Sequence, residues 1–411
     1  MKFVLPLSLL TAMLLAEDLS TLLPKASSNL RVESSRLMID KAQAQIDEAH
    51  SAYFPTISVG GIYQHKNKTT AFEPKTIHGL ELGAEVTLFD GFRREALLDA
   101  LRANKEGSQQ SMEQERQNVF IETIAAYYDY LDIRDRLETN AQKYKELNAQ
   151  VERYTILVQN DLATTDILKS LIASRLNTEY DDQNLRTQLA KNRKELELLC
   201  GSSINDEIVY RELSMPQLAQ MERHDLQSDR ASLEILEHTE DRYTYLPSIT
   251  LGAKHKEMHY KDYDTMGGAN AQPDSQNEIS ASLNLTLFDM GRISKEREQA
   301  RLDTLKARKL LDYKTKKLQN EADISLLSLD ASREALKAAK AEEEAREEAF
   351  KTIRSRFEAG LVNSTTYLSE LTSLSDARAK ARHAQNALQM AKANAAFTHG
   401  IDLMSLTEEK R

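Results

Sequence analysis

The chain has 411 residues, of which 41% are hydrophobic and 29% are charged, and its formal net charge is −10. This acidic balance disfavours nucleic acid as a partner, because neutralising a phosphate backbone requires an excess of Lys and Arg. The chain has one cysteine, Cys200, so neither an internal disulfide nor a cysteine-based metal cage can form. We therefore expect no disulfide framework and no zinc finger.

Sixteen residues at the N-terminus have the pattern of a targeting segment. Lys2 provides a positive charge, and an apolar stretch follows up to Leu15, before Ala16 and two acidic residues. This pattern is typical of a secretory signal peptide at 1–16, whereas a membrane-spanning helix would need about 20 apolar residues. A helix buried in a core is the alternative. The rest of the sequence holds no run of about 18 apolar residues, so any part inside a membrane should be β-strand.

The sequence contains an internal duplication. Tyr-Phe-Pro-Thr-Ile at 53–57 recurs as Tyr-Leu-Pro-Ser-Ile at 245–249, and Val-Thr-Leu-Phe-Asp at 86–90 recurs as Leu-Thr-Leu-Phe-Asp at 285–289. The two offsets are 192 and 199, so the second copy has seven extra residues between the motifs. Insertions of this kind fall in loops. The sequence therefore predicts two copies of one structural unit of about 200 residues.

Proline placement indicates where the long helices lie. No proline occurs from Lys75 to Met215 or from Asp274 to Arg411. A proline inside a helix costs about 3 kcal/mol, so these spans, rich in Leu, Ala, Glu, Lys and Arg, predict long helices. The first repeat, 17–213, should contain a helix at about 19–52, strands at 55–64 and 80–89, a long helix at 92–157, a helix at 163–199 and a linker at 200–214. The second repeat, 214–411, should contain a helix at about 216–245, strands at 248–255 and 279–288, a long helix at 291–357 and a helix at 364–400.

The expected strands alternate between apolar and polar residues. Leu80, Leu82 and Ala84 alternate with Glu81 and Gly83, and the second copy repeats the pattern from Ile279 onward. A ten-residue strand of this kind matches a transmembrane β-strand, although a half-buried strand in a soluble sheet has the same alternation. The predicted signal peptide favours the membrane.

Four strands are too few to close a barrel. Two chains would provide eight strands, and side chains just fill the interior of an eight-stranded barrel. Three chains form the smallest ring that leaves a hole. The long helices, roughly 100 Å each if straight, would extend this hole as a cylinder. We therefore expect a mainly α chain with a β-barrel portion: a long α-helical coiled-coil barrel plus four transmembrane β-strands, with a 12-stranded barrel in the trimer. A water-filled conduit follows as a hypothesis, and its pore-lining residues would be Glu81, Glu85, Asn284 and Thr286. The two glutamates would favour cations, unless this face is simply hydrated.

In order and spacing, these motifs resemble the TolC-type outer-membrane efflux protein family. Three motifs show this resemblance. They are the duplicated Tyr-x-Pro before a strand, the duplicated Leu-Phe-Asp-(x)-Gly after a strand, and the turn Arg-Phe-Glu-Ala-Gly-Leu at 356–361, with its counterpart at 160–168. The resemblance implies a homotrimer in the lipid of the cell outer membrane, with most of the chain in the periplasm. It also implies docking, through a periplasmic adaptor (membrane fusion protein), to an inner-membrane pump.

The function implied is the passive exit duct, or channel-tunnel, of a tripartite efflux or type I secretion system. A non-conducting periplasmic helical adaptor or scaffold stays open as the alternative. An adaptor would require additional domains with many short strands, for which the proline-free spans leave no room.

The resemblance also assigns roles at the two helix-to-helix turns. It implies adaptor contacts at Leu162, Ala163, Thr164, Gly360, Leu361 and Val362. It implies a periplasmic gate at Asp161, Asp166, Phe357, Thr366 and Ser369. Asp161 replaces the usual glycine, and the first turn looks one residue short. Phe357 has no hydroxyl group, so we expect no Tyr-to-Asp latch there. An ordinary helix-turn role is the alternative for each residue.

No catalytic or metal site is expected. His255 and His259 are four residues apart on a predicted strand, which separates them by about 13 Å, too far to share a metal. The sequence lacks a Gly-Lys-Ser/Thr phosphate loop, a Gly-x-Ser-x-Gly elbow and a His-Glu-x-x-His pair. We therefore expect no enzymatic activity and no cofactor. Cys200 fits as a small apolar residue at a helix end.

Overall fold

A computed structural model describes residues 17–69, 73–205, 207–216, 222–261 and 273–407. The signal peptide predicted at 1–16 therefore lies outside the described residues. Most of the segment around 260–273, where we expect the extra residues of the second copy, also lies outside them.

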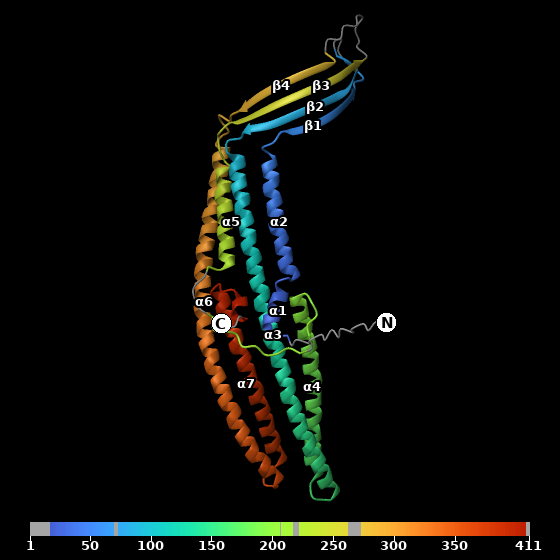
Figure 1. Cartoon of the computed structure of the whole chain (residues 1–411), viewed down its shortest axis with the longest axis vertical. Helices are drawn as coiled ribbons and strands as arrows, with labels where there is room; N and C mark the ends of the chain where they lie inside the picture. The colour runs from blue at the N-terminus through green and yellow to red at the C-terminus, as the bar shows by residue number, and fades with distance from the viewer. Residues whose placement is uncertain (1–16, 70–72, 206, 217–221, 262–272, 408–411) are drawn as a thin grey trace, which may run out of the picture. The chain divides into compact units, whose positions relative to one another are not determined.

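The chain divides into two compact units. The helical unit comprises Met1–Ser35, Met112–His224 and Lys314–Arg411, and the sheet unit comprises Arg36–Ser111 and Asp225–Tyr313. The elements are α1 (Leu19–Ala26), α2 (Leu30–Ser51), β1 (Thr56–His65), β2 (Thr76–Phe89), α3 (Arg93–Gln159), α4 (Thr165–Cys200), α5 (His224–Asp241), β3 (Ser248–Lys261), β4 (Ser275–Asn284), α6 (Arg292–Glu358), α7 (Ser364–Thr398) and the 3-10 helix η1 (Leu403–Thr407) (Figure 1). The prediction of a mainly helical chain with two strands from each repeat is confirmed.

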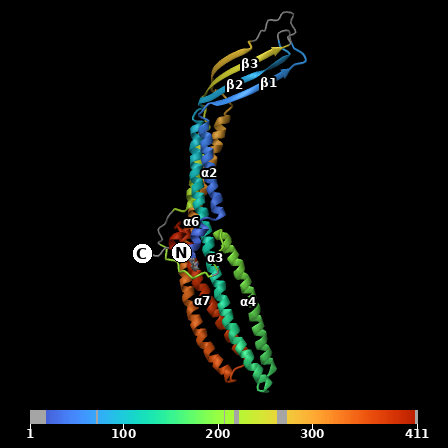
Figure 2. The same ribbon diagram turned by 45° about the vertical axis from the view of Figure 1, so that its right-hand side comes forward.

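The duplication appears directly in the helices. α3 and α6 each contain 67 residues, and they begin 199 residues apart. α4 and α7, with 36 and 35 residues, also begin 199 residues apart. Two helical hairpins, α3–α4 and α6–α7, result (Figures 1 and 2). None of the described helices is both long enough and apolar enough to cross a membrane.

The helix expected at about 19–52 is instead two helices, α1 and α2, separated by residues 27–29. Asn29 explains the break. Its side-chain amide donates to the carbonyls of Leu198 and Leu199, at 3.1 and 2.8 Å, and its Oδ1 accepts from the backbone N–H of Arg31 at 2.8 Å. The bond from Arg31, two residues along the chain, is of the local kind that competes with a continuous helix. Together, the hydrogen bonds of Asn29 begin α2 afresh and satisfy carbonyl groups at the end of α4.

The helix expected at about 216–245 is shorter in the structure: α5 begins at His224 and ends at Asp241. Residues 217–221 lie outside the described part. Pro247 accounts for the extended chain that follows. A proline restricts the residue before it to extended conformations, here Leu246.

The same proline shortens β4. We expected a strand at 279–288, but β4 spans Ser275–Asn284, and its last residue pairs with Ser248, the first residue of β3. Pro247 has no N–H with which to continue the ladder. The prediction that Thr286 lies in a strand is therefore wrong. Elsewhere β2 begins four residues earlier than expected, and β3 extends six residues beyond its expected end at 255.

The four strands form one antiparallel sheet in the order β1-β2-β3-β4 (Figure 1). The central pair, β2 and β3, joins a strand of the first repeat to a strand of the second. In each repeat, an aspartate lies between the second strand and the long helix, and its side chain caps the start of that helix. Asp90 Oδ2 accepts from the N–H of Arg94 at 3.0 Å, and Asp289 Oδ2 accepts from the N–H of Ile293 at 2.9 Å. These bonds satisfy N–H groups that have no partner within the helix.

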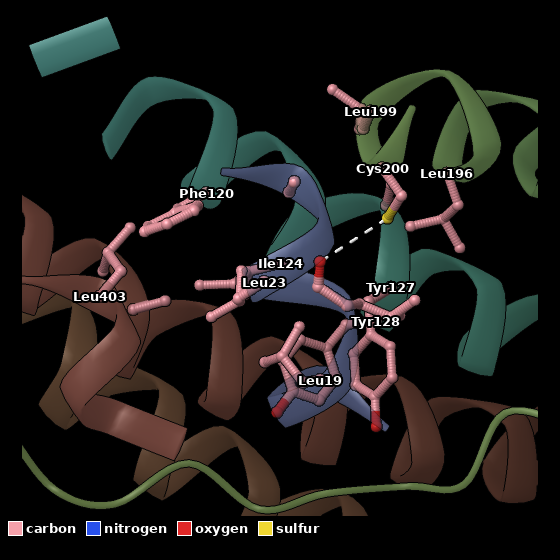
Figure 3. Packing of buried hydrophobic residues seen from close by; sticks show 14 of the residues in the cluster. Leu19, Leu23, Phe120, Ile124, Tyr127, Tyr128, Leu196, Leu199, Cys200 and Leu403 are labelled. Atoms are coloured by element: carbon pink, nitrogen blue, oxygen red, sulfur yellow. Dashed lines mark hydrogen bonds between the residues drawn. The ribbon is translucent and has the colours of Figure 1, made fainter. Parts of the chain in front are cut away.

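The core of the helical unit forms around α1. Leu19, Leu22 and Leu23 are fully buried against Phe120 and Ile124 of α3 (Figure 3). Tyr127 and Tyr128 of α3 bind the linker that follows α4. Their hydroxyl groups donate hydrogen bonds to the carbonyls of Val209 and Arg211, respectively. Cys200 lies inside this core, as expected for a small apolar residue, and its Sγ is 3.8 Å from the carbonyl oxygen of Leu22 (Figure 3).

Candidate functional site

The turn between α3 and α4 has the geometry of the turn between α6 and α7. Asp161 has a φ of 57° and Gly360 a φ of 74°, both in the left-handed region. The N–H of Leu162 donates to the carbonyl of Leu157 at 2.8 Å, and the N–H of Leu361 donates to the carbonyl of Arg356 at 2.8 Å. This is the Schellman motif, which commonly ends helices.

The two turns are also equally long. α3 ends at Gln159 and α4 begins at Thr165. α6 ends at Glu358 and α7 begins at Ser364, each 199 residues later. The expectation that the first turn is one residue short is therefore wrong. Asp161 takes the left-handed conformation that glycine takes in the second turn, because aspartate tolerates it better than most residues do.

The residues predicted to contact an adaptor cover the outside of these turns. Leu162 and Leu361 are 73% and 76% exposed. Thr164 and Gly360 are also exposed, whereas Ala163 and Val362 are half-buried against an apolar cluster inside the two hairpins. Two large exposed apolar side chains on equivalent turns are candidates for contact with a protein partner.

Four of the predicted gate residues, Asp161, Asp166, Thr366 and Ser369, are exposed. Hydrogen bonds from the Thr164 side chain and from the backbone N–H groups of Asp166 and Ile167 lower the pKa of the Asp166 carboxyl. Thr366 belongs to the start of α7, where its N–H and its hydroxyl both donate to Oδ1 of Asn363 at 2.8 Å. Both groups therefore stabilise helix starts within their own hairpins.

The fifth predicted gate residue, Phe357, is buried, with 2% of its surface exposed. Its ring stacks on Tyr367, with ring centroids 4.4 Å apart, and on Tyr154, at 5.3 Å. Phe357 thus lies in the apolar cluster that joins the two hairpins, which also includes Leu147 of α3 and Leu171 of α4.

A tyrosine ten residues after Phe357 provides the hydroxyl group that Phe357 lacks. Tyr367 is fully buried, and its hydroxyl donates to Oε1 of Glu146 at 2.6 Å. Arg354 lies 3.5 Å from the other carboxylate oxygen of Glu146. Burial, and then the hydrogen bond with Glu146, raises the pKa of Tyr367. This contact joins α7 to α3 across the two hairpins.

Sequence reasoning missed Tyr367, Glu146 and Arg354. A signal was present in the differences between the repeats. At an offset of 199, Leu168 stands where Tyr367 stands, and Ala345 is the counterpart of Glu146. Polar residues that occur in only one copy mark contacts that the duplication does not explain.

A second candidate site is the sheet, whose two faces differ in chemistry. Residues opposite each other in an antiparallel ladder point to the same face, and successive residues alternate between faces. The apolar face carries Ile57, Val59, Leu80, Leu82, Leu251, Ile279 and Leu283, which are between 37% and 89% exposed. The polar face carries Ser58, Glu81, Glu85, Lys254, Lys256, Glu278 and Asn284. The predicted alternation therefore extends across all four strands, while β3 also places His255, Glu257, His259 and Lys261 on the apolar face.

Three of the four predicted pore-lining residues, Glu81, Glu85 and Asn284, share the polar face, whereas Thr286 lies beyond the end of β4. Glu81 is not alone there. Lys254 Nζ and Lys256 Nζ each lie 3.7 Å from one of its carboxylate oxygens. The two histidines considered for metal binding, His255 and His259, lie on the other face. No group of three or more potential metal ligands occurs among the residues that the structure describes.

Comparisons with known proteins also separate the chain into two matching segments and identify a family. The family described as outer membrane efflux protein matches residues 25–202 and residues 215–398, one segment in each repeat. The outer membrane efflux protein BepC of Brucella suis is 21% identical over 342 residues, which cover 79% of this chain and 72% of BepC.

Two solved structures have the same fold. The CmeC outer membrane channel of Campylobacter jejuni has a TM-score of 0.81 at 16% sequence identity. The superposition covers 94% of this chain and 86% of the CmeC chain. The open state of the MtrE outer membrane channel of Neisseria gonorrhoeae has a TM-score of 0.78 at 16% sequence identity. The superposition covers 95% of this chain and 91% of the MtrE chain. Because the family match spans both repeats and most of the sequence, the chain belongs to the outer membrane efflux protein family.

Proposed function

We propose that this protein is the outer-membrane exit duct of a tripartite efflux or type I secretion system and that it acts as a homotrimer. It transports passively, without catalysis, and an inner-membrane pump supplies the energy through a periplasmic adaptor. Family membership and the shared fold support this function. The sheet would lie in the outer membrane and the helices in the periplasm.

The open edges of the sheet are the observation that carries the proposal. In the described sheet, β1 and β4 are the outer strands, and each has one neighbour. Unpaired backbone groups at such edges cannot remain unpaired in lipid. β1 and β4 run in opposite directions, so β4 of one chain can pair antiparallel with β1 of the next. Three chains would close a barrel of 12 strands, with room for a lumen.

Exposed apolar residues on the helices support a head-to-tail ring. Leu302, Tyr313 and Ile324 follow one another along α6 at 11-residue intervals and are 59%, 68% and 61% exposed. An interval of 11 residues is close to three turns, so these side chains share one helix face. Different helices, α2 and α4, expose Leu37 and Tyr180, at 62% and 71%. Contacts between unlike surfaces of identical chains are heterologous, and they form a ring when the rotation from one chain to the next closes.

The two exposed turns support the adaptor role. Leu162 and Leu361 stand at equivalent positions of two hairpins, so a trimer would present six similar apolar points. Repeated adaptor helices could then bind in register around the ring. The nearby cluster of Phe357, Tyr154 and Tyr367 would hold the hairpins together behind this surface.

Membrane fractionation tests the proposal. The protein should enter the outer-membrane fraction, have a trimeric mass in detergent and conduct ions in a planar bilayer. Leu82→Arg, on the apolar face, should block insertion, because arginine facing lipid costs about 2–4 kcal/mol near the bilayer centre. Ser58→Arg, on the polar face of the neighbouring strand, is the matched control and should insert. A soluble monomer without conductance would instead support a helical scaffold.

The gate residues are tested by conductance. Asp166→Ala removes an exposed carboxylate next to the turn and should reduce the fraction of time that the channel is closed. Lys169→Ala, three residues along the same exposed part of α4, is the control for an unrelated charge change. An unchanged closed fraction in the Asp166 variant would count against a gating role for this residue.

A further inference from the structure

The polar face of the sheet carries lysines as well as glutamates. In register, Glu81 of β2 lies directly opposite Lys256 of β3, and Lys254 is its diagonal neighbour. Each ammonium group lies 3.7 Å from a different oxygen of the Glu81 carboxylate. Glu81 is therefore held between two positive charges, at distances where opposite charges attract.

Lys254 has further acidic neighbours. It lies directly opposite Glu278 of β4, and the ladder makes it the diagonal neighbour of Glu85 as well as of Glu81. Side chains directly opposite each other have Cβ atoms about 5 Å apart, and diagonal neighbours lie about 7–8 Å apart, within reach of a lysine. Three glutamates therefore occupy strand positions next to Lys254, and Glu81 is the one with which the structure records an ion pair.

A glycine separates the two glutamates of β2 on this face. Gly83 lies between Glu81 and Glu85 on the polar face and pairs with Lys254. A Cβ atom at Gly83 would approach the Ser58 hydroxyl to 3.0 Å. In the described strands, the polar face carries three glutamates, Glu81, Glu85 and Glu278, and two lysines.

We infer that Lys254 and Lys256 balance the charge of the duct wall, so that the wall discriminates little between cationic and anionic solutes. This inference rests on the proposed function, since it takes the polar face to be the lumen. It replaces the expectation that Glu81 and Glu85 make the pore favour cations. A carboxylate flanked by ammonium groups has a field that falls off faster than the field of a lone charge.

The substrate class follows from this balance. Each chain has one more carboxylate than ammonium on the described polar face, so the residual field is weak and negative. Solutes of either sign, and zwitterions, can pass such a wall without a large barrier or a deep well. Selection by charge would then belong to the partners that load the duct.

Ion selectivity of the full-length trimer tests the inference. The reversal potential is measured in planar bilayers across a tenfold KCl gradient, at low ionic strength, where the Debye length reaches about 30 Å. Lys254→Gln combined with Lys256→Gln should raise the permeability ratio of K⁺ to Cl⁻ by about threefold or more. Glu81→Gln should lower this ratio below that of the unmodified protein.

Lys261→Gln is the matched control. It removes the same charge from the same strand, but residue 261 alternates onto the opposite face, so the permeability ratio should not change. A conducting channel whose ratio stays constant in the double lysine variant would overturn the inference and leave the proposed duct intact. An unmodified protein that does not conduct at all would overturn the proposed function as well.

Discussion

The hydroxyl group of Tyr367 donates a 2.6 Å hydrogen bond to Oε1 of Glu146, a residue 221 positions earlier in the chain. This contact joins the start of α7 to α3, and the ring of Tyr367 stacks on Phe357, which in turn stacks on Tyr154. It is the polar centre of an otherwise apolar cluster that connects the two helical hairpins.

Removing this hydroxyl group should destabilise the helical unit. A hydrogen bond to a charged group contributes about 1.5–3 kcal/mol, so Tyr367→Phe should lower the free energy of unfolding by about 1.5 kcal/mol, since Arg354 still faces Glu146. Thermal unfolding of the detergent-solubilised protein measures the change as a lower Tm. Tyr180→Phe is the control, because Tyr180 is 71% exposed, and should change the Tm little. Equal melting of both variants and the unmodified protein would refute the role of the contact.

The two left-handed turn positions should respond to substitution with opposite signs. Asp161→Gly relieves a conformation that glycine adopts freely and should stabilise the protein by about 0.5 kcal/mol. Gly360→Ala places a Cβ atom in the same conformation and should destabilise it by about 1 kcal/mol. Thermal unfolding measures both. Shifts in the same direction would show that backbone conformation does not dominate at these turns.

Cys200 should be chemically inert in the folded protein. It is 2% exposed, and burial raises its pKa to about 11, so little reactive thiolate forms at neutral pH. A maleimide reagent, followed by mass spectrometry, should leave the native chain unmodified and add one label in denaturant. Leu361→Cys adds a thiol on an exposed turn and should be labelled at once in the native state. Rapid labelling of Cys200 itself would contradict its burial.

Three buried tyrosines should make the protein sensitive to alkali. Burial raises the pKa of Tyr127, Tyr128 and Tyr367 above the ordinary value near 10. The folded state then holds these protons more tightly than the unfolded state does. Their contribution to stability is therefore complete below pH 10 and is lost as the pH rises above it.

Phenolate absorbance and circular dichroism follow this transition together. The chain has 15 tyrosines and no tryptophan, so the absorbance change reports tyrosine ionisation without an overlapping indole signal. Tyr127, Tyr128 and Tyr367 should ionise only at a pH above the ordinary pKa of tyrosine, together with the loss of helix. Ionisation of these three tyrosines near pH 10, with the helices intact, would contradict the expected shifts.

Much of the fold could be predicted because its elements depend on local patterns. The long proline-free spans correspond to α3 and α6, and the alternation around Leu82 and Glu81 corresponds to the two faces of β2. Asp90 and Asp289 begin helices as their hydrogen-bonding capacity suggests. Errors arose where a single residue acts through distant contacts. Asn29 begins α2 as a separate helix while it bonds to the end of α4, and Pro247 stops the pairing of a strand that lies far along the chain.

By itself, the sequence determined the duplication, the element types, the turns and the alternation of apolar and polar residues, because each depends on neighbours within a few turns or strands. Only the tertiary structure decided which groups from distant segments meet. The pairing of β2 with β3 brings Lys254 and Lys256 to Glu81, and the packing of the hairpins brings Tyr367 to Glu146. The physical reason is that such contacts depend on strand register and helix packing, which no local period encodes.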